Sequence, residues 1–97
     1  MRGEANLAID GREHLLRPSF AALCQAEEEL GPLFALVERA GEGQLRLAEI
    51  AALFWHMVRD RPAGLTREDV GRAVVEGGLA RATPVLRVVL RQMLEGA

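Results

Sequence analysis

The chain has 97 residues, 49% of them hydrophobic, and a formal net charge of −2 at pH 7. The apolar content excludes a disordered chain, and the length fits one domain with its own core, which we expect to span residues 1–97. An acidic balance argues against a dedicated nucleic-acid binder, because such domains are usually basic.

The sequence shows no signal peptide, no membrane-spanning segment and no pair of cysteines, and these three features together predict the cellular location. Residues 1–10 lack the long apolar core of a signal peptide, and no run of about 18 apolar residues could span a membrane. The single cysteine, Cys24, cannot form an internal disulfide, which fits a reducing compartment. We expect a cytoplasmic protein whose partners are neither membrane nor nucleic acid, with Cys24 as a small buried hydrophobe.

A β-hairpin is predicted over residues 3–17. Residues 3–9 alternate, with apolar side chains at 5, 7 and 9, as in a half-buried strand. Asp10-Gly11 suits the positive φ angles of a tight turn, and Arg12 to Arg17 form the returning strand. Pro18 ends that strand because it has no N–H to donate to a ladder.

The first helix is predicted from Ser19, as its N-cap, to Leu30, with Gly31 as the residue that ends it. Phe20, Leu23 and Cys24 mark an apolar stripe at helical spacing, which we expect to be buried.

An acidic triplet, Glu27 to Glu29, follows late in this helix, where the macrodipole disfavours anions. Two interpretations stay open for it. It is either a solvated acidic end or a docking surface for a basic partner.

Two more helices are predicted in the middle of the chain. The second starts at Pro32 and ends at Gly41, and the third runs from Leu47 to about Arg59. The apolar side of the second comprises Leu33, Phe34, Leu36, Val37 and Ala40. The buried stripe of the third comprises Ile50, Leu53, Phe54, Met57 and Val58, widened by Leu47 and Ala51, with Trp55 and His56 off the stripe.

The last third of the chain predicts two helices with distinct start signals. Thr66 and Asp69 form a capping-box-like pair, and Gly77-Gly78 ends that helix. Thr83 is the expected cap of the final helix, Pro84 to Leu94, because proline is well tolerated at the first helical position.

This final helix is apolar over a wide arc. Arg87 and Arg91 lie four residues apart on its other side. Its expected buried face comprises Leu86, Val89, Leu90, Met93 and Leu94, and Val85 and Val88 extend the arc beyond what one packing surface needs.

The predicted fold class is therefore α+β: an N-terminal two-stranded β-hairpin (residues 3–17) followed by four or five short α-helices (residues 19–95) in one small domain. No internal repeat or low-complexity segment divides it.

No residue pattern indicates enzyme chemistry. His14 and His56 have no second histidine or cysteine at ligand spacing, so we expect no metal, no cofactor and no catalytic residue. Trp55 is a candidate partner anchor, because tryptophan is enriched in interface hot spots, although a core position is an equal alternative. The candidate partner-binding residues are Trp55, Val85, Val88, Arg87 and Arg91.

Several segments of the chain form one pattern, and together they cover nearly all of it. They are RGE at Arg2 to Glu4 with the Asp10-Gly11 turn, LRPSFAALCQAEEELG at Leu16 to Gly31, LAEIAALFWHMV at Leu47 to Val58 and LTREDVGRAVVEGGL at Leu65 to Leu79. Together these segments resemble one family, the small tail proteins of gene transfer agents in alphaproteobacteria and their prophages, and the segment from Leu16 to Gly31 is the most specific.

The resemblance implies a non-enzymatic tail-assembly chaperone, encoded between the tail tube and tape-measure proteins and binding one or both of them. Some descriptions of the family instead imply a structural tail tube or connector subunit, which would be virion-associated. A third hypothesis is a helix-turn-helix regulator built on residues 66–94. Its turn, Gly77 to Ala82, is longer than usual and the chain is acidic, and both count against it. The sequence also leaves open whether the chain forms a homo-oligomer.

Overall fold

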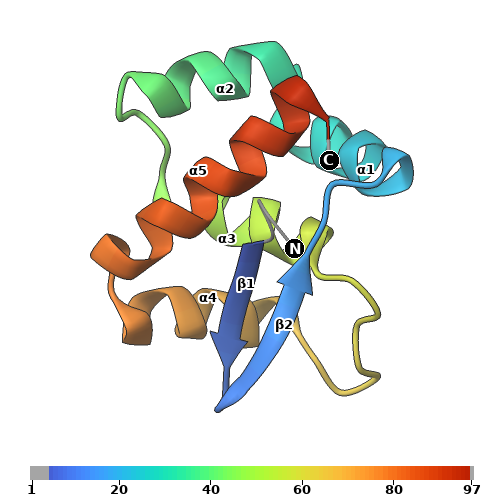
Figure 1. Cartoon of the computed structure of the whole chain (residues 1–97), viewed down its shortest axis with the longest axis vertical. Coiled ribbons are helices and arrows are strands. Elements are labelled where there is room, and N and C mark those ends of the chain that lie inside the picture. Colours follow the sequence, from blue (N-terminus) through green and yellow to red (C-terminus); the bar gives the residue numbers. More distant parts are fainter. Residues whose placement is uncertain (1–4, 97) are drawn as a thin grey trace.

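The computed structural model describes residues 5–96, and a two-stranded hairpin followed by five helices confirms the predicted fold class (Figure 1). The predicted hairpin residues 3 and 4, the RGE segment and residue 97 lie outside the described residues. The elements are β1 (Ala5–Ile9), β2 (Arg12–Leu16), α1 (Phe20–Leu30), α2 (Leu33–Gly41), α3 (Leu47–Met57), α4 (Arg67–Gly77) and α5 (Leu79–Glu95).

The hairpin has the turn and the register that its sequence predicts. Asp10 and Gly11 have φ angles of 51° and 80°, so both central residues of the turn are left-handed, as a tight hairpin turn requires. The strands pair antiparallel with Ile9 opposite Arg12 and Ala5 opposite Leu16. Alternate side chains of β1, beginning with Ala5, are buried against the helices, and α4 and α5 pack against this strand.

The outer edge of β2 is closed by the residues that end α3. Arg17 donates its backbone N–H to the carbonyl of Met57 at 2.8 Å, and Arg59 donates to Leu15 at 2.9 Å. Leu16 and Val58 are bridge partners between these bonds. The hairpin is thus attached through its backbone to α3, which supplies the fully buried side chains Leu53 and Phe54.

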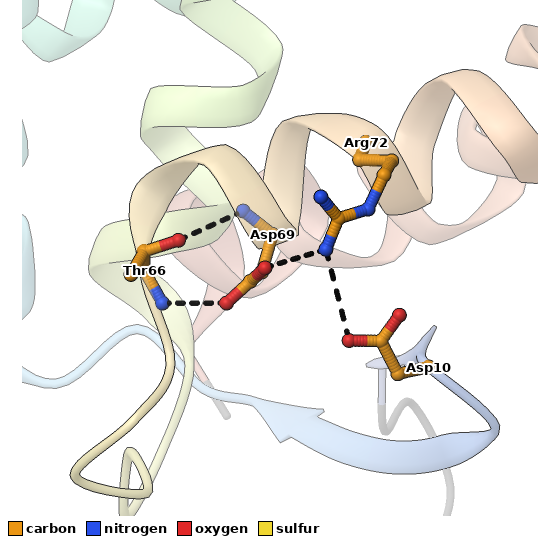
Figure 2. Close-up of polar contacts among 4 residues, drawn as sticks. All are labelled: Asp10, Thr66, Asp69 and Arg72. Atoms are coloured by element: carbon orange, nitrogen blue, oxygen red, sulfur yellow. Dashed lines mark hydrogen bonds and ion pairs between the residues drawn. The ribbon is translucent and has the colours of Figure 1, made fainter.

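Two helix starts are confirmed by their caps. The Ser19 hydroxyl accepts the N–H of Ala22 at 3.1 Å. Thr66 and Asp69 exchange two hydrogen bonds, of 2.9 and 3.2 Å, in the reciprocal arrangement shown in Figure 2. Hydrogen bonds from Thr66 are the main cause that lowers the pKa of Asp69.

Arg72 links the capping residue Asp69 to the hairpin. Its Nη2 contacts Asp69 at 2.6 Å and Asp10 at 3.8 Å, so the first turns of α4 are connected to the β1–β2 turn (Figure 2).

The predicted start of the last helix is wrong. α5 begins at Leu79, directly after Gly78, so Thr83 is no cap and Pro84 lies inside the helix. The N–H groups of Arg81 and Ala82 both donate to Gly78, and the Thr83 hydroxyl donates to the carbonyl of Leu79 at 2.8 Å. Good helix formers before the proline thus extend the helix by one turn, although proline removes a bond inside it.

The predicted buried stripe of α1 is also wrong. Phe20 is 85% exposed and Cys24 is exposed, while Leu23 is half-buried. The buried residues are Ala22 and Ala26, one turn apart, and α1 packs against α3. The expectation that Cys24 is a buried hydrophobe fails for the same reason, because the helix turns its alanines inward.

Other predicted inward positions differ in the same way. In α2 only Leu36 is buried, and Phe34 is 83% exposed. Leu47 at the start of α3 and Leu94 near the end of α5 are also exposed. Apolar side chains are therefore more numerous than this small core can cover.

We expect Pro84→Ala to stabilise the protein by about 1–3 kcal/mol, because alanine restores the N–H that proline withholds from the Ala80 carbonyl. Thermal and denaturant unfolding measure the difference. Pro62→Ala, in the loop before α4, is the control and should be neutral or slightly destabilising, since it only frees the unfolded chain. A Pro84→Ala protein no more stable than the parent would contradict a continuous α5.

Candidate binding surface

Trp55 lies half-buried on α3, under two arginines. The guanidinium carbon of Arg61 is 4.2 Å from the ring centroid, and that of Arg67 is 6.0 Å away. Arginine over an indole face is a favourable cation–π arrangement. The ring thus contributes to the core on one side and supports arginines on the other.

Glu29 connects three helices beside this tryptophan. Its Oε1 lies 2.8 Å from Nε2 of His56 on α3, and its Oε2 accepts a hydrogen bond from Arg67 on α4. The hydrogen bond from Arg67, followed by that from His56, lowers the pKa of the Glu29 carboxyl. The side chain of His56 is 9% exposed, and its buried Nδ1 has no hydrogen-bond partner within residues 5–96.

The acidic triplet is therefore largely engaged in the fold. Glu27 accepts the N–H of Leu33, at the start of α2, at 3.2 Å, and Glu29 joins α1 to α3 and α4. Glu28 is exposed. All three glutamates are exposed, as the solvated interpretation expects, and the carboxylates of Glu27 and Glu29 also hold neighbouring elements.

An apolar hollow of about 140 Å³ lies between α1, α2 and α5. The C-terminal end of α5 comes close to α1 and α2 in Figure 1. Two of its lining side chains, Phe34 and Leu94, are 83% and 57% exposed, so the apolar surface continues outside the hollow. The hollow is lined by Leu23, Leu33, Phe34, Val37, Met93 and Leu94.

The structure does not gather the sequence-predicted binding residues in one place. Val85 lines a hollow beside β1, and Val88 is half-buried. Arg87 and Arg91 are exposed on the side of α5 that also carries Leu94. Trp55 instead lies with Arg61 and Arg67.

Sequence reasoning missed the exposure of Phe34 and Leu94. A usable signal was present in α2, where four of five consecutive positions from Leu33 to Val37 are large and apolar. A nine-residue helix buries only one stripe, so such a run leaves apolar side chains outside.

Within residues 5–96, no three histidine, cysteine or acidic side chains gather as metal ligands, and no helix is long and apolar enough to cross a bilayer. What the fold and surface define is a small α+β domain that presents uncovered apolar side chains around a hollow between three helices.

Comparison with known proteins places this domain in a phage tail family. Residues 2–96 match the family model described as phage tail tube protein, GTA-gp10. The chain therefore belongs to the GTA-gp10 family of phage tail assembly chaperones, a family not known to be enzymatic. No curated protein and no solved structure matched the chain.

We expect Glu29→Gln to destabilise the protein at neutral pH by up to about 1 kcal/mol, because the Glu29 contacts are partly solvated. A lowered folded pKa means that this stabilisation is complete above the unfolded pKa of about 4.3 and is lost as pH falls through the folded value. The gap between parent and variant should therefore close on acidification, in melting curves recorded from neutral to acidic pH.

Glu28→Gln is the matched control, since Glu28 is exposed on the same helix. It should show no gap at any pH. A gap for Glu29→Gln that persists unchanged in acid would contradict the role given to the carboxylate.

Proposed function

We propose that this protein is a non-enzymatic tail-assembly chaperone that binds the tape-measure protein, the tail tube protein or both. Family membership supports the general role. The observation that carries the proposal is the apolar hollow between α1, α2 and α5, with Phe34 and Leu94 exposed at its edges. Uncovered apolar patches on small soluble domains mark interaction sites.

The proposed ligand of the hollow is an apolar stripe of a partner helix. Amphipathic helices bind by placing apolar side chains into such grooves. A tape-measure protein is long, apolar and helical, and needs to be kept in solution while tube subunits assemble around it. This places the chaperone's action in the bacterial cytoplasm, before the particle is complete.

The proposed binding centre differs from the residues that the sequence favoured. Trp55, Val85 and Val88 are half-buried, which leaves them less surface for a partner than Phe34 and Leu94. Arg87 and Arg91 remain proposed contacts, because they share the exposed side of α5 with Leu94.

A structural tail subunit is the second candidate, because the family description names a tail tube protein. Purified particles separate the two roles. A chaperone is absent from them, whereas a tube or connector subunit is present at a fixed ratio to the other tail proteins.

We expect Phe34→Asp and Leu94→Asp each to reduce recovery of the coexpressed tape-measure or tube protein at least about tenfold, since a charge replaces an apolar contact at the edge of the hollow. Pull-down of the tagged protein measures this. Phe20→Asp is the matched control, because Phe20 is equally exposed but does not line the hollow. Equal recovery with all three variants would place the binding surface elsewhere.

A further inference from the structure

The outer edge of β1 is the open edge of the hairpin. Ile9 and Arg12 flank a two-residue turn, so they form a hydrogen-bonded pair, and such pairs alternate along the ladder. The backbone groups of Asn6 and Ala8 therefore point away from β2. Within residues 5–96, neither residue makes a backbone hydrogen bond beyond the hairpin.

The opposite edge of the hairpin confirms this alternation. The carbonyl of Leu15 on β2 and the N–H of Arg17, which directly follows β2, point outward and bond to the residues that end α3. One edge is thus paired, while the other offers two N–H groups and two carbonyls in extended geometry. Such a row of groups is a template for pairing with another extended backbone.

A hollow of about 250 Å³ runs beside this open edge, and we call it the β1 slot. Figure 1 shows the corner between α4 and α5 beyond β1, on the side away from β2, and this corner forms the far wall. Gly77 and Gly78 carry no side chain, and a Cβ built at either would meet no atom within 4 Å outside its own helix and chain neighbours, so the wall is open at this corner. Its lining includes Asn6 and Ala8 on β1, Gly77 and Gly78 at the corner, and Arg81 on α5.

We propose that the β1 slot binds one extended segment of a partner tail protein, which pairs with Asn6 and Ala8 as a third strand and places a carboxylate side chain near Arg81. Arg81 is exposed and forms no ion pair within residues 5–96, so its charge is available to such a ligand. The proposal rests on the proposed function for the source of the segment, but it names a different surface and a different ligand conformation.

A second copy of the chain fits this edge poorly. Antiparallel pairing of two β1 strands relates the copies by a two-fold axis perpendicular to the sheet, which puts both helical layers on the same face. The α4–α5 corner of each copy lies beyond its own β1 edge and would occupy the space of the other's helices. A single extended chain avoids that collision.

The test uses short overlapping peptides that cover the tail tube and tape-measure proteins of the same gene cluster, titrated against the whole protein. We expect a subset to bind, and Ala8→Pro to weaken their binding about tenfold, because proline removes an N–H that faces the slot. Ala8→Val is the matched control, since it keeps the N–H and favours a strand. Arg81→Glu should weaken the same peptides, whereas Arg12→Glu, an exposed arginine outside the slot, should not.

Amide exchange of the unmutated protein gives a second measurement that does not depend on a variant's folding. Bound peptide should slow exchange at Asn6 and Ala8, whose N–H groups face the slot, with little change at Leu7, which already bonds to β2. Protection confined to α1, α2 and α5, equal binding by Ala8→Pro and Ala8→Val, or no peptide binding at all would overturn the proposal. A dimer that Ala8→Pro dissolves would overturn it as well.

Failure here is distinguishable from failure of the proposed function. If full-length tail proteins are recovered and Leu94→Asp abolishes recovery while no peptide binds, the chaperone role stands and the β1 slot is not used. If peptides bind through Ala8 and Phe34→Asp has no effect on full-length recovery, the β1 slot is retained as a binding site and the apolar hollow is rejected as one.

Discussion

Two backbone hydrogen bonds between β2 and the residues that end α3 organise this small structure. An isolated two-stranded hairpin is marginal in water, and these bonds attach it to the most deeply buried helix. They also make the hairpin asymmetric. The residues that end α3 cover the edge of β2, whereas the edge of β1 stays open, with the α4–α5 corner beside it.

Charged side chains then set the positions of the outer helices around α3. Glu29 holds α1 to α3 and α4, while Arg39 on α2 contacts Glu49 on α3 at 2.8 Å. The bond from Arg39, with one from the Arg46 backbone, lowers the pKa of Glu49 to about 2. The apolar hollow lies between α1, α2 and α5, and the contacts of Glu29 and Arg39 attach two of these helices, α1 and α2, to α3.

Local signals in the sequence predicted the hairpin, the caps at Ser19 and Thr66, and the buried stripe of α3. These signals failed at positions whose burial depends on the packing of one helix against another. Nothing local shows that α1 buries Ala22 and Ala26 rather than Phe20, because the rotation of a helix depends on how closely its neighbour approaches. The start of α5 was wrongly predicted at Pro84 for a related reason, since the packed helix tolerates the hydrogen bond that proline removes. The apolar hollow and the β1 slot could not be predicted from the sequence, because both consist of side chains and backbone groups that the packed core leaves exposed.

α5 contributes to both proposed surfaces, with Arg81 at the β1 slot and Leu94 at the apolar hollow. These positions are about 20 Å apart along the helix axis at 1.5 Å per residue. A hollow of about 140 Å³ takes only one or two side chains, and a five-residue edge takes a short strand, so each contact alone is weak. Two weak contacts with one partner raise each other's effective concentration and still separate one at a time. That combination suits a chaperone, which has to hold an assembling protein and then release it.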